Sequence, residues 1–211
     1  HKLRSKINIE DVSDQFDVFA GFGSSIHSAT GLTGDSGHTI KVSNGLMMVD
    51  PRLAAMGIRM ILTKNTVPTV GDLKECDSSN YELLRITLGV PDGVQDMQFQ
   101  KTILLEAGFD ELNGINWKKG CYMGQELTAR TKYRGLIKRR LISVSVDGPL
   151  PEPGTLIMFG EKEAGEIRSG VGNAAIALMR LNILEEWSRL GGELTAGSSC
   201  VMPQKQSWMN F

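Results

Sequence analysis

The chain has 211 residues, 41% of them hydrophobic, and a formal net charge of −1. This length and composition support one large or two small globular domains, exclude a chain that is disordered throughout, and leave no apolar run near the roughly 20 residues that cross a membrane. The three cysteines are odd in number and widely spaced, which argues against a disulfide framework or a self-contained zinc site and favours a soluble protein of a reducing compartment.

The first part of the chain predicts short strands joined by turns. Residues 3–9 and 15–20 alternate or cluster as short strands do, and residues 31–37 are rich in turn formers. Residues 46–49 form an apolar run that ends at an Asp-Pro pair, so a further strand is expected there.

Two helices are expected after these strands. Asp77 or Ser78 can cap a helix that runs to Gly89, and a turn should follow it. Residues 99–112 are the second helical candidate. Strands and helices together predict an α+β fold for this part of the chain.

From Leu141 onward the pattern changes to that of strands. Ile142, Val144 and Val146 would share one face of a strand, and short segments separated by glycines continue to the end of the chain. The expected boundary lies at residues 134–140. It divides the chain into an α+β part, residues 1–135, and a β-rich part, residues 141–211.

The most informative segment is the octapeptide Lys-Gly-Cys-Tyr-Met-Gly-Gln-Glu at residues 119–126. Glycines at 120 and 124 allow positive φ angles and close approach of another group, which leaves Cys121 and Tyr122 as presented side chains. This pattern is typical of a functional site rather than of core packing.

The residues that follow predict a helix over 125–133, so Cys121 would lie just before a helix N-terminus. The helix dipole together with Lys118 and Lys119 favours the thiolate form of this cysteine. The alternative is a small buried cysteine in a tight turn. Cys76 and Cys200 have no such frame and are interpreted as structural.

Positive charge is concentrated around this site. Between residues 118 and 140 there are eight Lys or Arg against Glu126 alone, which gives +7 and leaves −8 for the rest of the chain. A small anionic ligand, a nucleic acid and a plain solvated surface all remain compatible with this stretch.

The octapeptide also carries a resemblance to a known family. With Leu-Thr-Ala-Arg after it and Leu-Asn-Gly-Ile before it, at residues 112–115, it resembles the signature of the YgfZ proteins, bacterial relatives of a mitochondrial iron–sulfur assembly factor. Further segments follow in the family order: Leu-Arg-Ser-Lys at 3–6, Asp-Pro-Arg at 50–52, and Arg-Ile with Gly-Val-Pro at 85–91.

The resemblance implies the fold of the glycine cleavage T protein, a folate-dependent aminomethyltransferase. Residues 1–135 would then form a partial folate-binding α+β domain, and residues 141–211 a C-terminal β-barrel. Family members begin with an additional segment, so the N-terminal part of the family fold is expected to be missing here.

The resemblance further implies a tetrahydrofolate cofactor, or a folate derivative, and a role in assembly or repair of iron–sulfur clusters. Cys121 would be the functional thiol, either as a transient ligand of iron or a cluster or in thiol redox chemistry. One cysteine needs a partner to complete a cluster site. No resident metal site is expected. The residues expected to bind folate are Arg85, Lys119, Gly120, Tyr122, Gln125, Glu126 and Arg130.

Two other functions stay open at this point. One is folate-dependent aminomethyl transfer, an enzyme activity that is disfavoured because Thr87 stands where the T protein motif has glutamate. The other is an accessory role in tRNA modification through the basic stretch, with RNA as partner. The expected partners are iron–sulfur assembly proteins or client enzymes, without a membrane. The expected compartment is the bacterial cytoplasm, with the mitochondrial matrix as the alternative.

Overall fold

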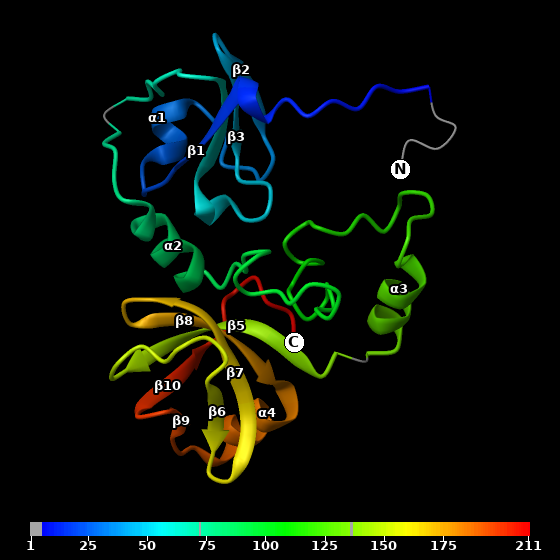
Figure 1. The fold of residues 1–211 in the computed structure, drawn as a ribbon, viewed down its shortest axis with the longest axis vertical. Coiled ribbons are helices and arrows are strands. Elements are labelled where there is room, and N and C mark those ends of the chain that lie inside the picture. The colour runs from blue at the N-terminus through cyan, green and yellow to red at the C-terminus, as the bar shows by residue number, and fades with distance from the viewer. Residues whose placement is uncertain (1–5, 72, 136) are drawn as a thin grey trace. The chain divides into compact units, whose positions relative to one another are not determined.

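The computed structural model describes residues 6–71, 73–135 and 137–211. The chain forms two compact units, His1–Glu75 and Cys76–Phe211. The fold is α+β and ends in a closed six-stranded barrel, as expected (Figure 1). The boundary expected at residues 134–140 falls inside the second unit, just where the first barrel strand begins, and the expected domain division stays a prediction.

The first unit is built on one antiparallel sheet of four strands in the order β1-β4-β3-β2. The helices are α1 (Ile26–Thr30) and the 3-10 turns η1 (Ser13–Gln15) and η2 (Ala54–Met56). The strands are β1 (Phe16–Gly21), β2 (Thr39–Val42), β3 (Gly45–Val49) and β4 (Ile58–Thr63). The strands predicted at 15–20 and 46–49 are therefore confirmed.

The core of this unit follows from the alternation of its strands. Ile58, Met60 and Leu62 of β4 are all buried, whereas the residues between them are less so. Ile26 of α1 packs in the same cluster. The strand predicted at 3–9 is not found: residues 6–9 have no regular structure, and residues 3–5 lie outside the described part of the chain.

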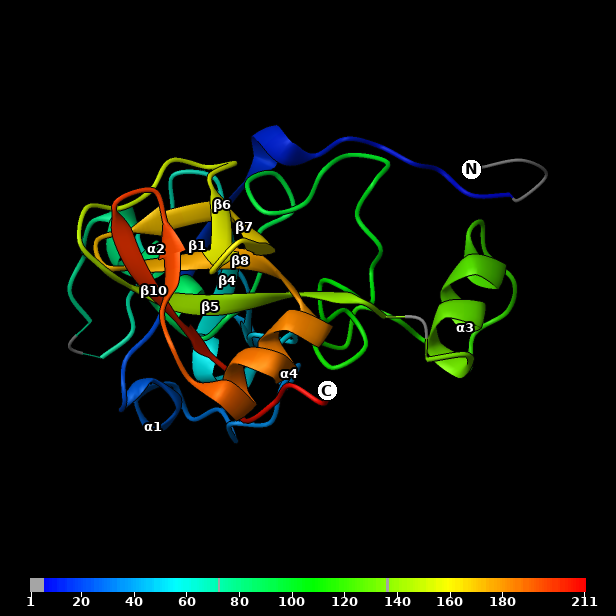
Figure 2. The same cartoon turned by 90° about the horizontal axis from the view of Figure 1, so that it is seen from below.

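The second unit begins with α2 (Ser78–Thr87) and α3 (Gln125–Tyr133). The Asp77 carboxylate accepts a hydrogen bond from the Ser79 amide at 2.8 Å, which is the predicted N-cap. The predicted helix at 125–133 is confirmed in both bounds. In neither view does α3 lie against the barrel (Figures 1 and 2).

The barrel closes in the order β10-β5-β8-β7-β6-β9, with α4 (Leu181–Leu190) between β8 and β9. Its strands are β5 (Arg139–Asp147), β6 (Leu156–Phe159), β7 (Lys162–Val171), β8 (Ala174–Arg180), β9 (Leu194–Ala196) and β10 (Ser199–Gln204). Ile142, Val144 and Val146 belong to the main barrel core, as their spacing predicted. Leu141 is also buried, in a second cluster with Ile86 of α2, so β5 is covered on both faces.

The predicted helix over 99–112 is wrong. These residues form consecutive turns instead. Gly108 adopts φ 73°, in the left-handed region, and a Cβ there would lie 3.1 Å from the Trp208 ring. A right-handed helix cannot pass through such a residue, so tertiary packing overrides the local helical pattern.

Within the described ranges, no helix is long and apolar enough to span a bilayer.

Candidate functional site

The loop before α3 presents the Cys121 thiol to solvent. Cys121 is exposed, which contradicts the alternative of a buried turn cysteine. Cys76 and Cys200 are exposed as well, so burial does not support their interpretation as structural cysteines, which stays a prediction. Exposure therefore does not distinguish Cys121 from the other two thiols. Any distinction has to come from the loop that carries Cys121.

The two glycines of the octapeptide differ in conformation. Gly124 has φ 85° and is the N-cap of α3, so it needs the freedom that the sequence predicted. Gly120 does not take the positive φ that the sequence predicted, because its φ lies outside the left-handed region. A Cβ at either glycine would meet no atom within 4 Å. Both glycines therefore leave open space beside Cys121, into which another group can approach.

Helix α3 is polar and partly exposed. Its N-cap glycine offers no side-chain acceptor, and Glu126 lies in the first turn, where a negative charge suits the free amides. Thr128 and Thr131 are buried, and their hydroxyls donate to carbonyl oxygens one turn earlier. The apolar side chain of Leu127 is 53% exposed, so one face of α3 carries apolar surface without a partner among the described residues.

The other predicted ligand residues gather on the same loop and helix. The Lys119 ammonium lies 5.3 Å from the centre of the Tyr122 ring, within the range of a cation–π contact. Gln125 is half-buried, whereas Glu126 and Arg130 are exposed. Within the described residues, no ion pair involves Lys119, Glu126 or Arg130.

Asp110 is a residue that the sequence reasoning missed. Its carboxylate accepts hydrogen bonds from Trp117 Nε1 at 2.5 Å and from Lys132 Nζ at 2.7 Å. Lys132 also lies 4.2 Å from the centre of the Trp117 ring, and that ring meets Tyr133 edge-on. No sequence motif marks Asp110, because its partners lie 7 and 22 residues away.

Burial is the largest single influence on the Asp110 carboxyl and raises its pKa. The hydrogen bonds from Lys132 and Trp117 favour the charged form, and together with the nearby positive charges they outweigh burial. The net result is a pKa below the ordinary value for aspartate. Asp110 is therefore a charged acceptor at neutral pH.

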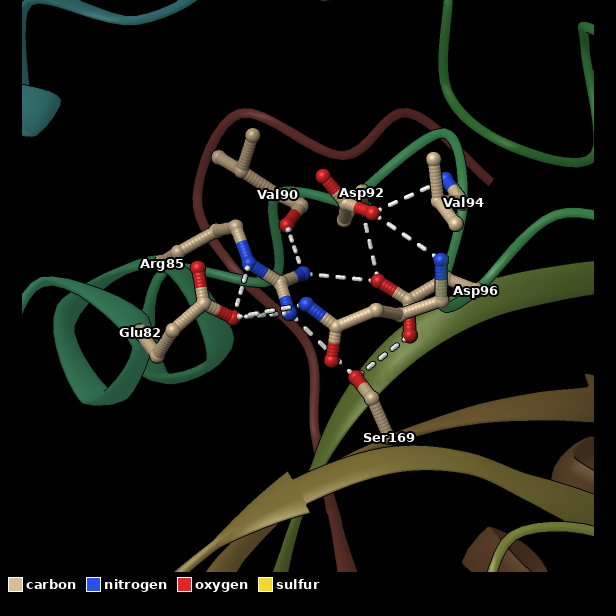
Figure 3. A network of polar contacts seen from close by, with 8 residues as sticks. Glu82, Arg85, Val90, Asp92, Val94, Asp96 and Ser169 are labelled. Atoms are coloured by element: carbon tan, nitrogen blue, oxygen red, sulfur yellow. Dashed lines mark hydrogen bonds and ion pairs between the residues drawn. The ribbon is translucent and has the colours of Figure 1, made fainter. Parts of the chain in front are cut away.

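Arg85 does not belong to the predicted ligand site. Its side chain is buried, and its guanidinium makes five hydrogen bonds, the number of N–H donors that it has. The acceptors are Glu82 (twice), the Val90 carbonyl, Asp96 and the Ser169 hydroxyl (Figure 3). No donor is left for a folate carboxylate, so Arg85 is not a ligand residue of the candidate site.

The ion pairs explain the charge state of Arg85. Burial is the largest influence and lowers its pKa, but the hydrogen bond that Arg85 donates to Glu82 and the negative charges of Asp96 and Glu82 raise it above the ordinary value. The Asp96 side chain is fully buried, and its carboxylate forms an ion pair with the Arg85 guanidinium at 2.6 Å. Arg85 therefore stabilises the fold of the second unit rather than binding a ligand.

A small pocket of about 140 Å³ lies in the second unit, between the turns at 96–106 and the barrel strands. Lys101, Glu106, Arg139 and Arg168 are among its lining residues, and none of the predicted ligand residues is. Pockets for drug-sized ligands are typically about 300–1,000 Å³, so this one is too small for a folate. Among the described residues, no group of three or more His, Cys, Asp or Glu could hold a metal ion.

Comparison with known proteins agrees with the barrel. Residues 138–211 match the family model of the CAF17 C-terminal β-barrel domain. The chain is also 36% identical over 149 residues to the mitochondrial iron–sulfur cluster assembly factor IBA57 homolog of Dictyostelium discoideum, covering 68% of this chain and 36% of that protein.

Mammalian proteins of the same name are similar as well. The mouse factor (Mus musculus) is 32% identical over 188 residues, covering 85% of this chain and 51% of that protein. The human factor (Homo sapiens) is 36% identical over 139 residues, covering 64% of this chain and 39% of that protein. The chain thus spans about half, or less, of the length of these relatives.

These findings bear on two expectations. The similarity lies with IBA57 factors and a CAF17 barrel, and membership of the YgfZ family in particular stays a prediction. The names of the relatives place those proteins in mitochondria, so the preference for the bacterial cytoplasm is not borne out. The mitochondrial alternative is carried forward.

Proposed function

We propose that this protein acts in iron–sulfur cluster assembly and that Cys121 is its functional thiol. The observation that carries the proposal is the exposed cysteine on a glycine-framed loop before α3, in a chain similar to iron–sulfur cluster assembly factors. The same names support mitochondria as its compartment, and within them we propose the matrix.

The chemistry of this role is thiolate ligation. A cysteine thiolate is the usual ligand of iron in clusters, and a cluster usually takes four protein ligands. Cys121 supplies one, and the described residues offer no group of three metal ligands. The cluster is therefore cargo that Cys121 holds together with thiolates of a partner, an assembly protein or a client enzyme.

We further propose that the loop and α3 bind tetrahydrofolate or a related folate. Lys119 and Arg130 carry no ion pair within the described residues and can meet the glutamate carboxylates, and Tyr122 offers an aromatic face. Open space at Gly120 permits close approach, and Gln125 and Glu126 offer polar contacts. Arg85 is not part of this proposal. Thr87 in the T protein's glutamate position continues to disfavour aminomethyl transfer.

Replacement of Cys121 tests the first proposal. Cys121→Ser keeps the size of the side chain but not the thiolate, so it should abolish rescue of iron–sulfur enzyme activity in cells that lack the protein. Cys76→Ser and Cys200→Ser are matched controls, since both thiols are exposed too, and they should rescue fully. Full rescue by Cys121→Ser would refute the functional thiol.

Gly120→Val tests the folate proposal. A Cβ at Gly120 meets nothing within 4 Å and the backbone there is not left-handed, so valine should leave the fold intact but fill the space beside Cys121. Lys119→Ala removes the candidate cation. Titration calorimetry with tetrahydrofolate should show weaker binding for both variants, with Lys162→Ala as the control. Wild-type affinity in both variants would contradict the proposed folate site.

A further inference from the structure

The segment around Asp110 is anchored to the barrel. The Leu105 carbonyl accepts a hydrogen bond from the buried Arg140 side chain at 2.8 Å, and the Glu106 carbonyl accepts one from the Leu141 amide at 2.8 Å. Ala107 is buried in the cluster that contains Leu141. These contacts attach residues 105–107 to strand β5.

The contacts continue on both sides of Asp110. Glu111 forms an ion pair with Arg140 at 2.8 Å, and the Phe109 carbonyl accepts a hydrogen bond from the Gly114 amide at 2.7 Å. Asp110 thus lies between two residues with fixed contacts. Its carboxylate occupies a defined place relative to β5.

The thiol loop, residues 118–124, begins with local contacts: the Lys118 and Lys119 amides donate hydrogen bonds to Asn116 Oδ1 at 2.9 and 3.1 Å. The two flanks of residues 118–124 are Trp117 before the loop and α3 after it. Asp110 binds one flank through Trp117 and the other through Lys132, with one carboxylate oxygen for each. Because Lys132 also covers the Trp117 ring, the three side chains form a closed triangle at the base of the loop.

We infer that Asp110 is the positioning residue of the thiol site: it clamps both flanks of the Cys121 loop to the barrel-anchored segment. The inference deepens the proposed function, on which its importance rests. Asp110 touches neither the cluster nor a ligand and acts only through Trp117 and Lys132. Without it, Cys121 would remain exposed but would sample a wider range of positions, which weakens shared ligation of a cluster with a partner.

A nitroxide label on Cys121 tests the clamp directly. The label is attached in the full chain with Cys76→Ser and Cys200→Ser, so that Cys121 is the single thiol, and its mobility is read by electron paramagnetic resonance. Asp110→Asn keeps the shape but removes the charge and one acceptor, and the rotational correlation time should shorten. Asp147→Asn, at an exposed aspartate of β5, should leave it unchanged.

Two further measurements separate positioning from general loosening. A label on Cys200 of β10, with the other two cysteines replaced, should not respond to Asp110→Asn. Lys132→Met should shorten the correlation time at Cys121, and the double variant should show less than the sum of the two single effects. No change at Cys121, or an equal change at Cys200, would overturn the inference.

The label also separates this inference from the proposed function, because it requires neither a cluster nor a folate. Asp110→Asn should reduce rescue in cells while circular dichroism of the barrel stays at the wild-type signal. If the label at Cys121 responds but Cys121→Ser rescues fully, the clamp stands and the functional thiol falls. If the label does not respond while Cys121→Ser fails to rescue, the functional thiol stands and the clamp is refuted.

Discussion

At the scale of single residues, buried charge has a structural role in both units. Asp50 is 1% exposed, and its carboxylate accepts hydrogen bonds from Arg52 and Arg59. Burial is the largest single influence and raises its pKa, but the hydrogen bonds from the two arginines together outweigh burial and lower the pKa to about 2. Such an acid stabilises the folded state only while it is ionised.

The pH dependence of the first unit follows from Asp50. The folded-state pKa lies below the ordinary value of 3.8, so the stabilisation is complete above about pH 4 and is lost as the pH falls toward 2. The shift corresponds to about 2 kcal/mol in the free energy of unfolding. Hydrogen exchange of the β3 and β4 amides measures this free energy in wild type and in Asp50→Asn. The difference between the two proteins should shrink as the pH falls from 4 toward 2.

Asp14→Asn is the control for this measurement, since Asp14 is exposed in η1. Its stability difference from wild type should be small throughout. A gap between wild type and Asp50→Asn that does not change between pH 5 and pH 2 would contradict an ionised, arginine-bound Asp50.

At the scale of elements, Arg85 joins three segments of the second unit. It belongs to α2, its guanidinium binds Asp96 in the turn that follows, and it reaches Ser169 of β7. Ser169 in turn donates to Asp96 at 2.5 Å. The network therefore fixes α2 and its turn on the barrel wall, as Figure 3 shows.

Removing Arg85 should be costly because it leaves Asp96 buried without its counter-charge. We expect Arg85→Met to lower the free energy of unfolding by about 3–5 kcal/mol. Arg180→Met is the matched control: Arg180 and its partner Glu163 are 46% and 44% exposed, so we expect about 1 kcal/mol or less. Urea unfolding followed by tryptophan fluorescence measures both, and equal costs would refute the structural role of Arg85.

At the scale of the whole molecule, the two units have separate cores. The cluster around Val49 and Ile58 belongs to the first, and the barrel cluster belongs to the second. All three tryptophans, Trp117, Trp187 and Trp208, lie in the second unit, so their fluorescence reports on that unit alone. The thiol loop, the Asp110 clamp and the Arg85 network are all in this second unit.

The sequence by itself determined the features that depend on local order. The Asp77 cap, the bounds of α3 and the inward face of β5 follow from capping and from periodicity, which neighbouring residues supply. The presented Cys121 was recognisable for the same reason, since its glycine frame is contiguous in the chain.

The tertiary structure alone decided what depends on residues far apart. The sequence predicts Arg85 as a ligand cation, but its guanidinium pairs with a buried acid eleven residues away and donates to a serine hydroxyl 84 residues away. The helix predicted at 99–112 gave way to turns because Trp208 packs on Gly108. Asp110 had no local pattern at all. Long-range pairing sets which charges are free, and a single sequence carries no record of that pairing.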